Sequence, residues 1–160
     1  MCFAKNHLIS NIKKIMKQFK NLSQHDTDAL LKFPAYISML AANRDDTLDE
    51  EERKAAIKFA HTKTFSCVPM LADFYNEADK AFEANINQID NDLPKDLKSR
   101  EAAIKNELLN LDKIVLKLGK KYARVMHSSM VSFKEHVSRA HHNVLVDFLF
   151  PIPIPGLTDK

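Results

Sequence analysis

The first 22 residues carry apolar side chains at the spacing of a helix. These positions recur at steps of three and four residues: Leu8, Ile12, Ile15, Phe19 and Leu22. Lysines occupy other angles of the same helix: Lys13, Lys14, Lys17 and Lys20. Because one face is apolar and the other is charged, residues 1–22 are predicted to form an amphipathic helix that packs on the body of the protein.

The next stretch, HDTDALLKFPAYISMLAAN at residues 25–43, is predicted to be the most buried helix. It opens with the cap-type residues Asp26 and Thr27, and it is apolar on nearly all sides between residues 33 and 42. Pro34 lies inside this stretch, and a proline cannot donate to the preceding helical turn. The chain therefore either kinks at Pro34 or begins a new helix there.

Two more helices are predicted before the next break. The first covers LDEEERKAAIKFAHTKTF at residues 48–65, where Thr47 and Glu50 have the spacing of a capping box. The second covers residues 66–89, where Pro69 falls near the first turn and apolar residues recur at helical spacing. The sequence IDNDLPKD then predicts an interruption, because it joins cap-type residues to a proline.

A helical pattern continues from residue 97 to residue 142, which is longer than an ordinary globular helix. Its stripe begins with Ile104, Leu108, Leu111, Val115 and Leu118. Gly119 is the only glycine inside this stretch, and glycine commonly ends a helix. Two helices that meet near Gly119 are therefore predicted.

The C-terminal sequence VLVDFLFPIPIPGLTDK is apolar and cannot stay helical beyond about Phe150. Alternating prolines impose an extended or polyproline-like backbone: Pro151, Pro153 and Pro155. An exposed surface this apolar would bind a partner or aggregate, so the tail is expected either to pack along the body or to dock into another subunit or partner. The candidate partner-binding residues are Phe148, Phe150, Ile152, Ile154 and Leu157.

Together these elements predict an all-α protein, a compact bundle of about six or seven helices with an extended proline-rich apolar tail. The chain has 160 residues, 45% of them hydrophobic, and only two glycines, which suits one helical domain. The predicted divisions are the N-terminal helix at residues 1–22, the helical domain at residues 23–143 and the tail at residues 144–160.

Charge and cysteine content limit which cellular compartment and which classes of partner are expected. The net charge of +3 is too small to favour nucleic-acid binding, but the five lysines of residues 1–22 meet no acid there. This basic face leaves open a contact with an anionic membrane surface. Cys2 and Cys67 form no disulfide framework, and no run approaches the ~20 apolar residues of a membrane-spanning helix. A soluble, cytoplasmic protein is expected.

The acidic corner, RDDTLDEEERK at residues 44–54, is the strongest candidate for chemistry. Asp45, Asp46, Asp49 and Glu52 can present oxygen atoms from a turn and the helix that follows it. Hard divalent cations such as Ca²⁺, Mg²⁺ or Mn²⁺ prefer oxygen ligands of this kind. The alternative is purely structural, because acids in a first helical turn also complement the helix dipole.

The sequence around the acidic corner resembles the signature of the TerB-like families associated with tellurite resistance. That signature has an apolar helix, an Ala-Asp-Gly turn, an aliphatic residue and then a Glu. Asp45 matches the family Asp, Asp46 stands where Gly is usual, Leu48 is the aliphatic residue and Glu52 is the Glu. The resemblance covers residues 27–62.

The resemblance implies an all-helical accessory or stress-related module whose acidic residues bind a divalent cation, and not a known enzyme. The residues themselves also favour a non-catalytic protein, since no acid, base and nucleophile converge in the sequence. Two alternatives remain, a structural or interaction protein that uses the tail and a peripheral membrane module that uses the basic helix.

Overall fold

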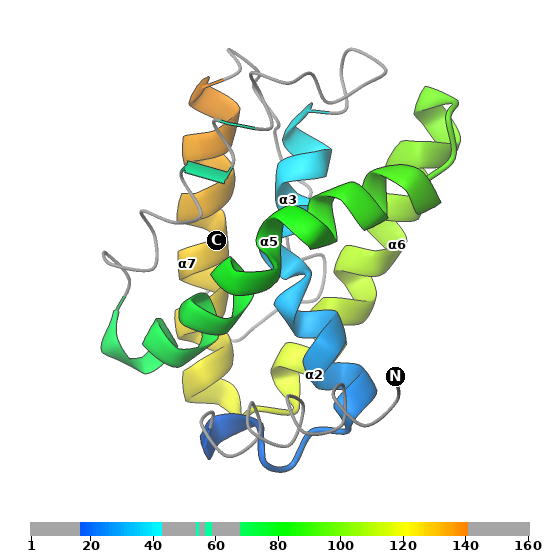
Figure 1. Cartoon of the computed structure of the whole chain (residues 1–160). Helices are drawn as coiled ribbons and strands as arrows, with labels where there is room; N and C mark the ends of the chain where they lie inside the picture. The colour runs from blue at the N-terminus through cyan, green and yellow to red at the C-terminus, as the bar shows by residue number, and fades with distance from the viewer. Residues whose placement is uncertain (1–16, 43–53, 55–56, 59–67, 141–160) are drawn as a thin grey trace, which may run out of the picture.

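A computed structural model describes residues 17–42, 54, 57–58 and 68–140, and every regular element in this part of the chain is helical (Figure 1). The elements are the 3-10 helices η1 (Lys17–Phe19) and η2 (Pro69–Leu71) and the α-helices α2 (Gln24–Leu31), α3 (Phe33–Ala42), α5 (Ala72–Asp92), α6 (Leu97–Leu116) and α7 (Lys120–Ala140). The prediction of an all-α protein is confirmed.

The described residues contain fewer helical bodies than the predicted six or seven. Only Lys32 separates α2 from α3, so these two form one bent rod beside α5, α6 and α7. The predicted N-terminal helix reaches the described residues only at its end, where Lys17–Phe19 is a 3-10 helix. Of the predicted helix at residues 48–65, the structure describes Lys54, Ile57 and Lys58, each of them helical.

The bent rod begins at Ser23, one turn earlier along the chain than the caps expected at Asp26 and Thr27. The backbone N–H of Asp26 donates to the Ser23 hydroxyl oxygen at 3.0 Å, which satisfies one of the open donors of the first turn. Pro34 is the second residue of α3, where its missing N–H breaks no hydrogen bond. Of the two possibilities at Pro34, the chain therefore begins a new helix.

The core is built around α3, which contacts α5, α6 and α7. Figure 1 shows α3 between α6 and α7, with α5 crossing in front of it. Phe33, Ala35 and Ile37 of α3 are completely buried. The prediction that residues 33–42 form the most buried helix follows from their apolar character, and the central position of α3 agrees with it.

Helices α5 and α6 bury apolar stripes that their sequences predicted, whereas on α7 only Phe133 and Val137 of the expected stripe are buried. On α5 the buried apolar residues recur at helical spacing: Phe74, Ala78, Phe82, Ile86 and Ile89. On α6 they include Ile104, Leu108, Leu111 and Val115. An aromatic group joins η1 to this core, with the Phe19 ring 6.3 Å from the Phe74 ring and 6.0 Å from the Tyr122 ring between centroids.

Two corners connect the long helices. Between α5 and α6, the buried Arg100 guanidinium pairs with the Asp90 carboxylate and reaches the Pro94 carbonyl oxygen. Between α6 and α7, Gly119 has φ of 91°, a backbone conformation that other residues rarely adopt. The predicted break at Gly119 is confirmed.

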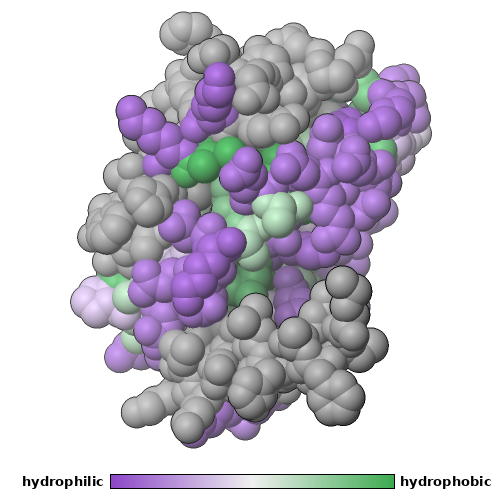
Figure 2. Space-filling view, viewed as in Figure 1, coloured by the Kyte–Doolittle hydropathy of each residue, from purple (hydrophilic) through white to green (hydrophobic). Residues whose placement is uncertain are grey.

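Hydrophilic side chains cover most of the described part of the face in Figure 2, with a narrow apolar strip between them. The large hydrophobic residues that the structure shows as exposed are scattered: Val68, Leu97 and Leu116. Within the described part of the chain, no helix combines the length and the apolar character needed to cross a bilayer.

Candidate functional site

The residues predicted to bind a cation or a partner lie outside the described part of the chain. The cation set is Asp45, Asp46, Asp49 and Glu52, and the partner set is Phe148, Phe150, Ile152, Ile154 and Leu157. Among the residues that the structure does describe, no three His, Cys, Asp or Glu side chains gather into a metal site. Along the sequence, the acidic corner begins two residues after Ala42, the last residue of the central helix α3.

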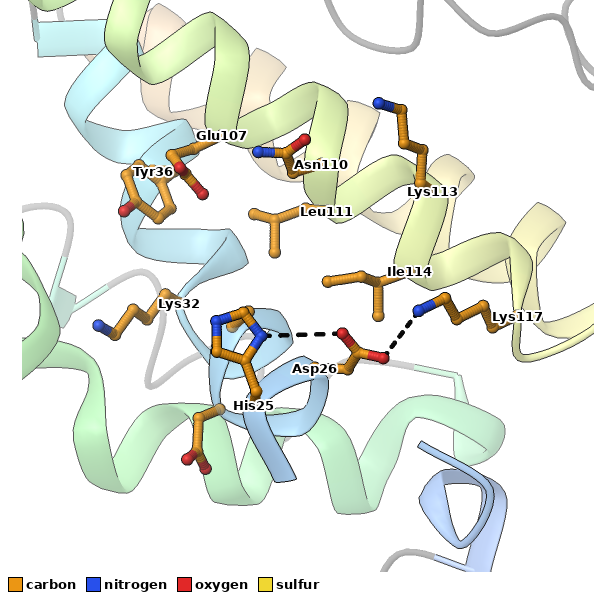
Figure 3. Close-up of a pocket in the computed structure, with 12 residues that line it drawn as sticks. His25, Asp26, Lys32, Tyr36, Glu107, Asn110, Leu111, Lys113, Ile114 and Lys117 are labelled. Carbon is orange, nitrogen blue, oxygen red and sulfur yellow. Dashed lines mark hydrogen bonds and ion pairs between the residues drawn. The ribbon is translucent and has the colours of Figure 1, made fainter. Parts of the chain in front are cut away.

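A groove of about 580 Å³ lies between the bent rod of α2 and α3 and one face of α6. This volume falls within the range of about 300 to 1,000 Å³ that is common for small-molecule sites. Figure 3 shows side chains from both walls around it. They are His25, Asp26, Asp28, Ala29, Lys32, Tyr36, Glu107, Asn110, Leu111, Lys113, Ile114 and Lys117.

The floor of the groove is apolar. Leu111 and Ile114 of α6 are buried, and in Figure 3 they lie between the polar groups of the two ends. Ala29 of α2 packs against the same core and is only partly buried. A ligand in this groove would therefore rest on aliphatic carbon and meet polar groups mainly at its ends.

At one end of the groove, Asp26 of α2 pairs with Lys117 at the C-cap of α6. Lys117 Nζ donates to Asp26 Oδ2 at 2.9 Å. The hydrogen bond from Lys117 is the largest cause that lowers the pKa of Asp26 below its usual value, and the Lys117 charge and Ser23 add to it. The pair joins two helices far apart in the sequence and keeps this end of the groove electrically balanced.

At the other end, Tyr36 of α3 lies beside Glu107 of α6 (Figure 3). Burial raises the pKa of the Tyr36 phenol, and the negative charges of Glu107 and Asp92 raise that pKa further. The phenol therefore stays protonated and keeps both its donor and its acceptor at physiological pH. Glu107 makes no hydrogen bond or ion pair with any residue that the structure describes.

The two remaining lysines of the groove line its rims. In Figure 3 the ammonium group of Lys32 points away from Glu107, and that of Lys113 points away from the Asp26–Lys117 pair. Neither lysine makes an ion pair within the described ranges. Among the described residues, the groove thus offers the Glu107 carboxylate, the Tyr36 phenol and the Asp26–Lys117 ion pair, while the Asp28 carboxylate accepts a hydrogen bond from Gln24.

A second polar pair lies inside the core. His127 Nε2 of α7 is 2.5 Å from Asp112 Oδ1 of α6, and the side chains are 0% and 1% exposed. The two groups approach closely without the alignment of a good hydrogen bond. Because both are sealed from solvent, no substrate reaches them in this conformation.

The sequence patterns did not predict the groove or the buried pair. The groove needs residues of α2 and α6 that are more than eighty positions apart to meet, and no local pattern encodes that contact. The sequence does contain an indication of the buried pair. Asp112 follows Leu108 by four residues and precedes Val115 by three, so a charged residue occupies a position of the apolar stripe. His127 interrupts the stripe of α7 in the same way, between Ala123 and Met130.

No protein-family model, no curated protein and no solved structure matches this chain.

Proposed function

We propose that this protein is a non-catalytic accessory module of the TerB-like type, which binds a divalent cation at its acidic corner. The ligands would be Asp45, Asp46, Asp49 and Glu52, the carboxylates that match or adjoin the signature. The single observation that carries the proposal is the position of the corner after α3, the helix that contacts α5, α6 and α7.

The mechanism follows from charge repulsion and from the central position of α3. Four carboxylates that share one short segment repel one another, and a bound Ca²⁺, Mg²⁺ or Mn²⁺ would offset that repulsion and draw them together. The chain leaving Ala42 would then adopt one ordered path. Because α3 is packed on three sides, ordering at its C-terminal end would alter the surface that the bundle offers to a protein partner.

The absence of catalysis is part of the proposal. In the described part of the chain, the closest pairing of a histidine with an acid is His127 with Asp112, and both side chains are buried. A general base must reach the proton of a bound substrate, and a group sealed in the core cannot do so. The pair is better explained as part of the helix packing.

The test is thermal melting of chelator-stripped protein with Ca²⁺, Mg²⁺ or Mn²⁺ added singly. A cation that binds only the folded state must raise the melting temperature. The variant Asp45→Asn, Glu52→Gln should lose that rise, whereas the control variant Asp73→Asn, Glu83→Gln, which removes two exposed acids of α5, should keep it. No rise with any of the three ions would overturn the proposal.

A further inference from the structure

We propose that the groove between the bent rod and α6 binds a primary ammonium ion with an aliphatic chain, held between Glu107 and Tyr36. The groove residues are not those of the acidic corner, and this inference does not depend on the proposed function. The ammonium would come from a free alkylamine or from the lysine side chain of a partner.

The charge of the groove selects a cation over an anion. Lys117 already shares its charge with Asp26, and the ammonium groups of Lys32 and Lys113 are turned outward at the rims. Glu107 has no hydrogen bond or ion pair to any described residue. An unpaired carboxylate beside a half-buried phenol favours a positively charged group.

The raised pKa of Tyr36 is a second indication of negative potential at this end of the groove. That pKa is raised by burial and by two carboxylates, Glu107 of α6 and Asp92 of α5. Negative charge from two helices therefore converges on one aromatic side chain of a third. An ammonium ion placed there can donate hydrogen bonds to the Glu107 carboxylate and to the Tyr36 phenol oxygen, and it can also lie against the ring face.

The apolar floor gives the ligand its aliphatic part. Leu111 and Ile114 lie between the Tyr36 end and the Asp26–Lys117 end in Figure 3. Along α6, Glu107 and Ile114 are seven residues apart, which is about 10 Å at 1.5 Å per residue. A chain of six methylene groups covers much of that floor, and a shorter amine would leave more of it exposed.

The experiment titrates the full-length protein with n-hexylamine and follows binding by NMR chemical shifts. The expected result is saturable binding with shifts at Tyr36, Leu111 and Ile114. Hexanol has the same chain without the charge, and hexanoate carries the opposite charge. Both should bind at least about tenfold more weakly, the effect expected from losing a charge-assisted hydrogen bond.

Matched variants separate the site from general surface effects. Glu107→Gln should weaken hexylamine binding by about tenfold or more, and Tyr36→Phe by a smaller factor. Glu83→Gln removes an exposed acid of α5 outside the groove and should leave the binding constant unchanged. Bound hexylamine should also lower the pKa of Tyr36, because a cation stabilises the phenolate.

A second probe identifies the source of the ammonium group. The probe is lysine methylamide acetylated on its α-nitrogen, which keeps the side-chain ammonium group as its only charge. Its binding would indicate a protein partner. Binding of hexylamine alone would indicate a free amine. Equal binding of hexylamine and hexanol, or an unchanged constant in Glu107→Gln, would overturn the proposal, as would the absence of any binding at millimolar hexylamine.

Discussion

His127 and Asp112 meet inside the core, with Nε2 and Oδ1 separated by 2.5 Å and both side chains closed to solvent. They fix α7 against α6 at one register, because a slip of either helix would leave two polar groups among aliphatic side chains. Buried pairs of this kind often add little net stability, since removing two polar groups from water is costly. Their contribution is then to the uniqueness of the packing.

The buried pair predicts a large difference between single and double replacements. His127→Leu should lower the free energy of unfolding by about 3 to 5 kcal/mol, because Asp112 then stays buried without this partner. Asp112→Ala combined with His127→Leu should recover most of that loss. Urea unfolding of the three proteins measures both effects, and a single variant as stable as the wild type would contradict this role.

The ion pair between Asp26 and Lys117 predicts a small loss of stability on acidification. Lys117 lowers the pKa of Asp26 in the folded protein, so the pair contributes above the usual value of 3.8. That contribution disappears as the pH falls through the lower pKa of the folded state. Because the Lys117 side chain is 56% exposed, the pair contributes about 0.2 to 1 kcal/mol.

Lys117→Met is the variant that tests this pair. The pKa of Asp26, measured by NMR titration of its carboxyl carbon, should rise toward the usual value. Lys98→Met changes an exposed lysine of the same helix outside the groove and serves as the control. An Asp26 pKa that is the same in both variants would show that Lys117 is not its partner in solution.

Tyr36 predicts a loss of stability at alkaline pH. Its pKa is raised above the usual value of 10.0 in the folded protein, so the contribution of the protonated phenol is complete below pH 10 and falls as the pH rises further. Glu107→Gln should lower the pKa of Tyr36, because one of the nearby negative charges is gone. Tyrosinate absorbance, with Tyr36→Phe as the reference, measures the shift, and an unchanged pKa would contradict the electrostatic influence of Glu107 on Tyr36.

Replacing Gly119 by alanine is expected to lower the free energy of unfolding through backbone strain alone. A Cβ atom at this position would meet no atom within 4 Å, so crowding is not the problem. The φ of 91° is unfavourable for other residues, and Gly119→Ala should cost about 1 to 2 kcal/mol. Urea unfolding measures this cost. Ser132→Ala, an exposed change within α7, is the control and should alter stability by less than about 0.5 kcal/mol.

Local sequence signals predicted the elements that depend on local physics. Pro34 marks the start of α3, Gly119 separates α6 from α7, and the apolar residues 33–42 form the central helix. Each follows from a backbone restriction or from the need to hide apolar surface. The same signals misplaced the cap of α2, because Asp26 and Thr27 are as suitable for capping as Ser23, and only tertiary packing selects among them.

The polar contacts between helices could not be predicted in this way. Asp26 meets Lys117 because α2 packs on α6, and Tyr36 lies beside Glu107 because α3 also packs on α6. Nothing in the sequence next to any of these four residues indicates a partner so far along the chain. The acidic corner was the most conspicuous run of charge in the sequence, and its proposed role as a cation site stays a prediction.

The most direct test of that role is calorimetric titration of the chelator-stripped, full-length protein with Ca²⁺, Mg²⁺ and Mn²⁺ in turn. We predict one binding site per chain for at least one of these ions. The Asp45→Asn, Glu52→Gln variant should lose that site, and Asp73→Asn, Glu83→Gln should retain it. The absence of heat from all three ions, or equal binding by both variants, would contradict a cation site at the acidic corner.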